Sequence, residues 1–304
     1  MEASVEDRLV ILVTGCSSGF GRLMVEPLAR AGYTVYAALR DPSGRNTEAA
    51  HELSRLSDVG GLPVRVVEID LTSTSQVRGV VAAIEKEAGR IDVVVNNAGI
   101  FPYGITEAFT VEQFQRAIDI NVIGVFRIDQ AVLPIMRRRR SGLLVHLSSI
   151  GGRLVAPFFG LYSASKFALE ALAEILRYEL SGFGVDSVIV EPGPFRTGIH
   201  SRSEEPQDTL CLREYGQVAV VASHVLGSIQ QMVTDPNIPT DPQLVVDVVL
   251  KLIGTPTGQR PLRTVVGIDF GTPTLNETTS SVTAKALASM GLSHMENVKS
   301  AAQV

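Results

Sequence analysis

Short runs of apolar residues alternate along the chain with longer stretches in which apolar positions recur every three or four residues. The short runs lie at residues 9–13, 33–39, 64–69, 91–95, 143–147, 185–190 and 264–268. Runs of this length are typical of strands buried on both faces, and the stretches between them have the periodicity of helices. The alternation therefore predicts a single α/β domain, residues 1–304, built on a doubly wound parallel sheet of seven strands.

Two stretches depart from this alternation. Residues 111–140 form one long helical pattern, yet Asn121 and Gly124 lie in its middle and both are poor helix formers. We expect a kink there, with Asn121 acting either as a structural hydrogen-bonding residue or as part of a proton path. Residues 199–242 carry clusters of Pro, Asp and Ser around an apolar helical piece, 218–232, and we expect this segment to be a substrate lid at the rim of the ligand crevice.

The composition is that of a globular protein with a large core, since 45% of the 304 residues are hydrophobic and 19% are charged. A net charge of −5 argues against a nucleic-acid partner, which normally requires a basic protein. The four arginines at 137–140 are a local exception that we attribute to the end of the long helix, where cations complement the helix dipole. No apolar run approaches the length of a membrane span, and residues 1–8 have the pattern of neither a signal peptide nor an anchor.

The cysteines and histidines indicate neither a disulfide framework nor a metal centre. Cys16 and Cys211 lie far apart, which fits reduced thiols and a cytoplasmic location. The five histidines have no ligand spacing with one another or with the cysteines, so the sequence predicts no metal site.

A glycine-rich turn follows the first predicted strand and precedes a helical pattern. Glycines allow the backbone to turn tightly, and they let a pyrophosphate approach bare N–H groups at the start of the helix, where the helix dipole attracts an anion. Such a turn can also serve only to pack the helix against the strand, but its place after the first strand favours dinucleotide binding. The residues expected to contact the cofactor here are Gly15, Ser17, Ser18, Gly19, Phe20 and Gly21.

Polar residues also follow the next three predicted strands. Arg40 ends the second strand, roughly where folds of this type recognise the ribose 2′ group. Asp70, followed by Leu71, ends the third, and its carboxylate can accept a hydrogen bond from an adenine amine or cap the next turn. Asn97 and Gly99 follow the fourth, where small and amide residues permit close approach of a ribose. All of these residues are expected to contact the cofactor.

The candidate chemistry lies after the fifth strand, which ends at Ser148 and Ser149. Tyr162 and Lys166, four residues apart, share one face of a helix predicted over 162–180. An ammonium within a few ångströms favours the phenolate and lowers the phenol pKa from its ordinary value of about 10. Tyr162 would then be able to exchange a proton with a substrate oxygen. A Tyr and a Lys four residues apart are common on exposed helices, so the surrounding motifs must show whether this pair is catalytic.

Taken together, these motifs resemble the short-chain dehydrogenase/reductase family over residues 9–197 and the closing helix and strand. The matching positions, in order, are Thr14-Gly15-x-x-x-Gly19-x-Gly21, Asn96-Asn97-Ala98-Gly99, Asn121, Ser149, Tyr162-x-x-x-Lys166, Pro192-Gly193 and Thr197. The resemblance implies a Rossmann-type fold and an oxidoreductase that moves a hydride between a nicotinamide and a carbonyl carbon. Within the family, the chain is most similar to the steroid and retinoid dehydrogenase branch.

The resemblance also implies roles for individual residues. Tyr162 would be the general acid/base, and Ser149 would hold the substrate oxygen by a hydrogen bond. Lys166 would bind the nicotinamide ribose and lower the pKa of Tyr162, while Asn121 would support a water relay. Pro192 and Thr197 would complete the cofactor site.

We expect the cofactor to be NADP(H), because Leu39 stands where the family's NAD users carry Asp. Arg40 follows, with a planar fork suited to the 2′-phosphate, and Ser17 could add a hydroxyl donor. The alternative is that Arg40 forms an ion pair with Asp41 on the protein surface and does not contact the cofactor.

The expected substrate is an apolar ketone or aldehyde, or the corresponding alcohol. The hydrophobic residues near Ser149 either form its pocket or belong to an ordinary core: Ile150, Leu154, Val155, Phe158, Phe159 and Phe195. The helix at 162–180 is apolar on nearly every side, which predicts a homodimer or homotetramer. A non-catalytic NADP(H)-binding sensor or scaffold is the alternative function.

Overall fold

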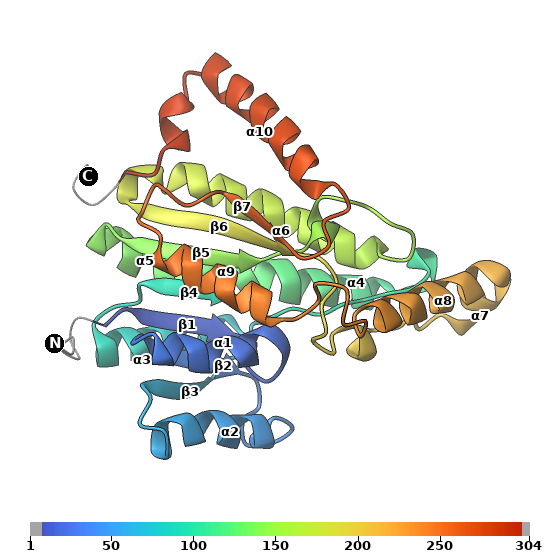
Figure 1. Cartoon of the computed structure of the whole chain (residues 1–304), viewed down its shortest axis with the longest axis horizontal. Coiled ribbons are helices and arrows are strands. Elements are labelled where there is room, and N and C mark those ends of the chain that lie inside the picture. Colours follow the sequence, from blue (N-terminus) through green and yellow to red (C-terminus); the bar gives the residue numbers. More distant parts are fainter. Residues whose placement is uncertain (1–7, 300–304) are drawn as a thin grey trace.

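The computed structural model of the chain describes residues 8–299, which form one α/β domain around a seven-stranded parallel sheet (Figure 1). The strand order is β3-β2-β1-β4-β5-β6-β7, and every neighbouring pair is parallel. The strands are β1 (Val10–Thr14), β2 (Thr34–Leu39), β3 (Val64–Glu68), β4 (Val93–Asn96), β5 (Gly142–Leu147), β6 (Val185–Pro192) and β7 (Arg263–Val266). The predicted Rossmann-type fold is confirmed.

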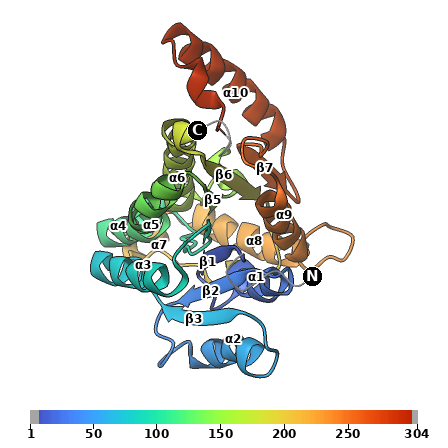
Figure 2. The same ribbon diagram turned by 90° about the vertical axis from the view of Figure 1, so that its left-hand side faces the viewer.

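Helices cover both faces of the sheet, which explains why the strands are continuous apolar runs. The helices are α1 (Gly19–Arg30), α2 (Thr47–Asp58), α3 (Thr74–Ala88), α4 (Val111–Ile118), α5 (Gly124–Arg139), α6 (Gly160–Glu179), α7 (Thr209–Glu214), α8 (Gln217–Met232), α9 (Gln243–Gly254) and α10 (Thr272–Ser289). Figure 2 shows α3, α5 and α6 on one face of the sheet and α1 and α9 on the other. The central strands β1, β5 and β6 are buried along their whole length.

The helical pattern predicted over 111–140 is not one helix. One π-helical turn, Asp119–Ile123, separates α4 from α5, and Asn121 lies in that turn. The side chain of Asn121 is almost completely buried and forms hydrogen bonds with the backbone N–H and carbonyl groups of Ile100, outside its own helix. These bonds stabilise the irregular turn. The expected irregularity is therefore present as a π-helical turn, and the hydrogen bonds of Asn121 to Ile100 anchor it.

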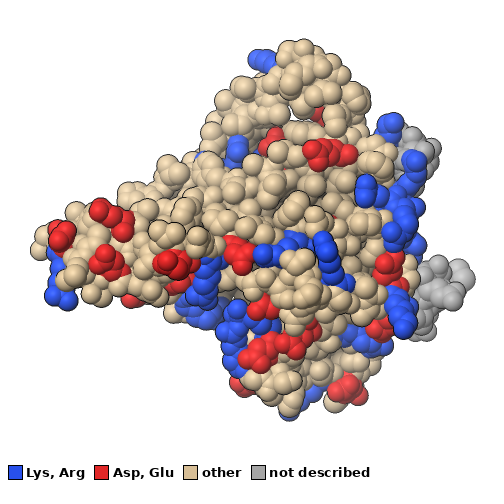
Figure 3. All heavy atoms as spheres, turned by 180° about the vertical axis from the view of Figure 1, so that it is seen from behind, with Lys and Arg blue, Asp and Glu red and all other residues tan. Residues whose placement is uncertain are grey.

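Residues 199–242 form an arm at the carboxyl ends of the strands. Helices α7 and α8 project beyond the body there (Figure 1, orange), and Ala222 is the one buried residue of α8. Seen from behind, in Figure 3, basic and acidic side chains are mixed over the body, while the arm surface is mostly uncharged apart from a few charged side chains. Helix α10 stands away from the body beside β7 and α6.

The arginine run at the end of α5 has local partners. The helix ends at Arg139, and Arg140 adopts a left-handed conformation with φ of 51°. Arg138 pairs with Glu85 at 2.5 Å, and the guanidinium of Arg137 lies 5.7 Å from the Phe183 ring centroid. Within residues 8–299, no helix is both long enough and apolar enough to cross a bilayer.

Candidate active site

A cavity of about 570 Å³ opens at the carboxyl ends of the strands. It lies where the strand order reverses between β1 and β4, the place at which doubly wound sheets bind ligands. Most of the predicted site residues line it: Gly15, Ser17, Ser18, Gly19, Phe20, Arg40, Asp70, Leu71, Asn97, Gly99, Ser149, Tyr162, Lys166, Pro192 and Thr197. Gly21 and Asn121 do not line the cavity, but both contact segments that do.

The glycine turn between β1 and α1 has the geometry expected of a phosphate cradle. Gly15 and Gly19 have φ of 75° and 57°, in the left-handed region that favours glycine. A Cβ atom on Gly21 would lie 2.6 Å from the carbonyl oxygen of Gly15, so Gly21 allows the turn to pack on the helix. Ser18, Gly19 and Phe20, at the start of α1, line the cavity, and the unpaired first N–H groups of a helix suit a diphosphate.

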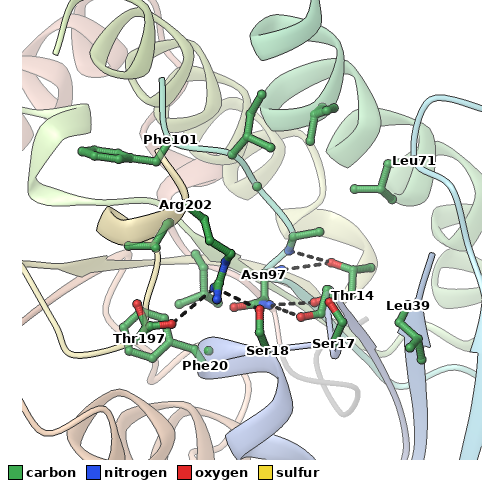
Figure 4. Close-up of a pocket in the computed structure, with 18 of the residues that line it drawn as sticks. Thr14, Ser17, Ser18, Phe20, Leu39, Leu71, Asn97, Phe101, Thr197 and Arg202 are labelled. Carbon is green, nitrogen blue, oxygen red and sulfur yellow. Dashed lines mark hydrogen bonds between the residues drawn. The ribbon is translucent and has the colours of Figure 1, made fainter. Parts of the chain in front are cut away.

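Asn97 holds this turn in place. Its Nδ2 donates to the carbonyl oxygen of Thr14 at 2.8 Å, and Thr14 Oγ1 accepts from the backbone N–H groups of Asn97 and Ala98 (Figure 4). The Asn97 amide, which the sequence predicted to approach a ribose, therefore instead connects β1 to the end of β4 by hydrogen bonds. The backbone of this segment, including Gly99, still lines the cavity.

The end of the cavity beside β2 is basic. Arg40 lines it, and no described residue forms an ion pair with Arg40, so the alternative pairing with Asp41 is not what the structure shows. Asp41 instead accepts from the backbone N–H of Arg45 at 3.1 Å, which turns the chain so that Arg45 also lines the cavity. Sequence reasoning missed Arg45, because it lies in a loop that no periodicity describes.

Asp70 and Leu71 border the same end of the cavity. Asp70 Oδ1 accepts hydrogen bonds from the backbone N–H and the hydroxyl of Thr72, at 2.9 and 2.7 Å, so this carboxylate caps the turn after β3. Burial raises the pKa of Asp70, but the hydrogen bonds from Thr72 and the charges of Arg40 and Arg45 outweigh it and leave the pKa below its ordinary value.

Ser149, Tyr162 and Lys166 converge at the opposite end of the cavity. Ser149 Oγ accepts from the backbone N–H of Gly151 at 3.1 Å and lies 3.3 Å from the carbonyl oxygen of Pro192. Lys166 Nζ donates to the carbonyl oxygen of Leu147 at 2.7 Å and lies 5.9 Å from the Tyr162 ring centroid. The Ser149 hydroxyl, the Tyr162 phenol and the Lys166 ammonium therefore line the same part of the cavity, as the sequence motifs predicted.

The pKa of Tyr162 is higher than predicted. Burial raises it to about 12, and the hydrogen bond with Ser149 lowers it by a smaller amount. The prediction that Lys166 lowers this pKa below its ordinary value is wrong for this arrangement, because the loss of solvent around the phenol outweighs the other influences. Burial also lowers the pKa of Lys166 to about 8, against the opposing charge of Glu170.

Asn121 supports this end of the cavity through the backbone. Its Oδ1 accepts from the N–H of Ile100 at 2.8 Å, and its Nδ2 donates to the carbonyl oxygen of Ile100 and to Ser165 Oγ, each at 3.0 Å. Ser165 Oγ in turn donates to the carbonyl oxygen of Tyr162 at 2.7 Å. These contacts fit the structural role proposed for Asn121, since they tie the segment after β4 to α6.

Tyr162 belongs to an aromatic cluster. The Phe101 ring packs edge-on against the Tyr162 ring with 4.8 Å between centroids, and Phe101 also contacts Phe159 and His200. Helix α8 covers this cluster with Ala222, which is buried against it. Sequence reasoning missed Phe101 and His200, because they lie in segments between regular elements.

The apolar residues predicted to line a substrate pocket divide into separate groups. Phe158 and Phe159 join the aromatic cluster, whereas Phe195 is in the core against Phe20 and also borders the cavity. Val155 is 80% exposed, and neither it, Ile150 nor Leu154 lines the cavity. Phe195 therefore fits both the pocket and the alternative of an ordinary core residue, whereas Val155 fits neither.

The residues present fit a nicotinamide dinucleotide. The glycine turn has no room for side chains at Gly15 or Gly21, and the cavity has cations at one end and the phenol at the other. A family model described as short chain dehydrogenase matches residues 9–208. The chain belongs to the short-chain dehydrogenase family. Members of this family are nicotinamide-dependent oxidoreductases.

Several known proteins are similar to this short-chain dehydrogenase over much of its length. The chain is 33% identical to estradiol 17-beta-dehydrogenase 1 of Rattus norvegicus, over 82% of this chain and 72% of that protein. It is 39% identical to 3-ketodihydrosphingosine reductase of Bacteroides thetaiotaomicron, over 62% of this chain and 65% of that protein, or just under two thirds of its length. A crystal structure of a short-chain dehydrogenase from Streptomyces avermitilis superposes with a TM-score of 0.74 and 32% identity, over 94% of this chain and 99% of that one. Steroid dehydrogenases are thus among the relatives, as the resemblance to that branch implied.

Proposed function

We propose that this protein is an NADP(H)-dependent oxidoreductase that interconverts an apolar ketone or aldehyde and its alcohol. The observation that carries the proposal is the convergence of Ser149, Tyr162 and Lys166 on a cavity whose other end has a glycine turn and two arginines. A non-catalytic sensor would need the nucleotide cradle but not a buried phenol beside an ammonium. The bound nicotinamide would supply or accept the hydride.

In the direction of reduction, the carbonyl carbon gains a hydride and the oxygen gains a proton from Tyr162 Oη. The raised pKa of Tyr162 keeps the phenol protonated at neutral pH, which suits a proton donor. Ser149 Oγ would hold the carbonyl oxygen, and the ammonium of Lys166 would stabilise the phenolate that forms. Alcohol oxidation is the reverse, and Tyr162 then takes the proton.

The preference for NADP(H) is supported by the end of β2. A carboxylate at Leu39 would repel a 2′-phosphate, and the chain has none there. Arg40 and Arg45 both line this end of the cavity, and Ser17 lies on the glycine turn beside it. Two guanidinium groups provide more charge than the single arginine that the sequence indicated.

The apolar substrate is supported by the surroundings of the phenol. The Phe101 ring packs against Tyr162, and Phe101 in turn contacts the rings of Phe159 and His200. Ala222 of α8 is buried in the same cluster. Burial lowers the pKa of His200, so this imidazole is neutral at physiological pH and adds no charge. We propose that the arm at residues 199–242 is the substrate lid, because it places this apolar surface over the phenol.

We further propose a homodimer or homotetramer. Helices α4, α5 and α6 lie side by side (Figure 2), and large apolar side chains on them and on the π-helical turn between α4 and α5 are exposed: Phe114, Ile123, Phe126, Phe167 and Ile175. Light scattering at micromolar concentration should give at least a dimer, and a monomer would contradict this part of the proposal. Both cysteines are free thiols, which supports the proposed cytoplasmic location.

A turnover assay tests the function. Purified protein is incubated with NADPH or NADH and a panel of bulky apolar ketones, aldehydes, sugar phosphates and keto acids. We expect NADPH oxidation with the apolar carbonyls, faster than with the charged compounds. Tight NADPH binding without turnover of any carbonyl would favour the sensor instead.

A further inference from the structure

Arg202 reaches back from the arm to the glycine turn. It belongs to a short 3₁₀ turn, His200–Arg202, at the start of the segment that leads to α7. Its Nη2 donates to Ser18 Oγ at 3.1 Å and to the carbonyl oxygen of Thr197 at 3.3 Å (Figure 4). Ser18 is the residue before α1, so the guanidinium lies over the N-terminal end of that helix.

The charge of Arg202 is not neutralised by any carboxylate among residues 8–299. Its two partners are a hydroxyl and a carbonyl, both neutral. The other cationic side chains that line the cavity lie elsewhere: Arg40 and Arg45 beside Asp70, Arg116 in an ion pair with Glu204 at 3.2 Å, and Lys166 at the carbonyl oxygen of Leu147. Arg202 is therefore the cavity's cation at the glycine turn.

A diphosphate bound at this turn would have two negative charges beside one helix N-terminus. The helix dipole offers only about half a unit of positive charge. A guanidinium presents several N–H donors in one plane and binds phosphate oxygens with shorter and stronger hydrogen bonds than neutral donors make. Because Arg202 Nη2 already lies between Ser18 and Thr197, it needs no large movement to bind such oxygens.

We propose that Arg202 binds the diphosphate of the dinucleotide from the side opposite α1, so that the start of the arm forms part of the cofactor site. The inference rests on the proposed function. It differs from the role of Arg40 in one measurable respect. The diphosphate is common to NADPH and NADH, so Arg202 contributes equally to both cofactors, whereas a residue at the 2′ position distinguishes them.

Equilibrium binding of each reduced cofactor, followed by nicotinamide fluorescence, tests the proposal without requiring turnover. Arg202→Gln is expected to raise the Kd of NADPH and of NADH by the same factor, about 10-fold, the lower end for a charged hydrogen bond. Arg202→Lys keeps the charge and should recover part of the loss. The binding of both cofactors to wild type should weaken with added salt, and Arg202→Gln should reduce that dependence.

Arg213→Gln is the matched control, since it removes one exposed arginine from the same arm at a position outside the cavity. Both Kd values should stay as in wild type. Circular dichroism and the melting temperature of each variant establish that it is folded. A variant of Arg202 that binds NADPH weakly but NADH normally would place the guanidinium at the 2′-phosphate and overturn the inference.

Unchanged binding of both cofactors in Arg202→Gln would also overturn it. If Arg202→Gln left binding unchanged but Arg40→Ala still weakened NADPH binding, the proposed cofactor preference would stand while this inference failed. Failure of the wild-type protein to bind either cofactor would overturn both.

Discussion

The two ends of the cavity differ in how much solvent reaches their charged groups. At the end with the phenol, Tyr162 is 8% exposed and Lys166 is 5% exposed, and both belong to the long helix α6. At the end beside β2, Arg40 is half-buried and Arg45 is exposed, and both lie in the loop after the strand. The same kinds of interaction therefore have different strengths at the two ends.

This difference in solvent exposure assigns the chemical step to the buried end and the choice of cofactor to the exposed end. In the buried end, removal of water strengthens each electrostatic interaction and shifts the pKa values of both catalytic candidates. At the exposed end, water screens the arginines, so they can favour one cofactor without controlling the chemical step. Changes at the first end should alter the rate, and changes at the second should alter the choice of cofactor.

The largest expected effect is at the buried end. Tyr162→Phe removes the proton donor while Lys166 and the glycine turn remain, so kcat for ketone reduction should fall by about 10² to 10⁴-fold. The Kd of NADPH should change little. Steady-state kinetics and fluorescence titration of the same preparation measure the two quantities. A variant that kept more than a tenth of the wild-type kcat would show that another group donates the proton.

A smaller effect is expected at the exposed end, and it should appear only in cofactor choice. Leu39→Asp combined with Arg40→Ala adds a repelling carboxylate and removes the guanidinium, so the preference for NADPH should reverse in favour of NADH. One charged hydrogen bond accounts for about a 10 to 150-fold difference. The ratio of kcat/KM for the two cofactors with one substrate checks this. Wild-type values within threefold of each other, or higher for NADH, would contradict the proposed preference.

The pH dependence of reduction should report the buried ammonium. Because the pKa of Lys166 is lowered to about 8, the charge is present below that pH and is lost as pH rises through it. Loss of the cation removes the group that stabilises the Tyr162 phenolate. We therefore expect kcat/KM for reduction to be level below pH 8 and to fall about tenfold per pH unit well above it. A profile that stayed level to pH 10 would be inconsistent with this role.

The smallest effect is expected for Arg45→Ala. An exposed charge pair is worth up to about 1 kcal/mol, so NADPH binding should weaken by up to about fivefold, and NADH binding should not change. Fluorescence titration of both cofactors at low and physiological salt measures this. A loss as large as that of Arg40→Ala would mean that the loop shields Arg45 from water when the cofactor is bound.

The sequence predicted the fold and most of the cavity lining for one reason. Strand and helix periodicities are local signals, and in a parallel sheet every strand's carboxyl end lies at the same edge, so Gly15, Asp70 and Ser149 could be placed together without knowing any distance. The π-helical turn at Asn121 gave a weaker signal. A poor helix former marks a site of irregularity, but only the contact with Ile100, across the fold, determines its form.

Other features had no local signal at all. Arg45 and Phe101 lie in loops and Arg202 lies in a short 3₁₀ turn, and tertiary contacts alone bring them to the cavity. The direction of the Tyr162 pKa shift was mispredicted for a related reason. Neighbouring charges can be guessed from spacing, but the extent of burial depends on Phe101 and on α8, which come from distant parts of the chain.

The strand order also bears on how the chain can fold during its synthesis. β2 pairs with β1, β3 with β2, β4 with β1, and β5, β6 and β7 each pair with the strand made just before them. No strand after β1 therefore has to wait for a later one before it finds a partner. The sheet can grow outward from β1 as the ribosome releases each segment, which limits the time for which unpaired strand edges are open to aggregation.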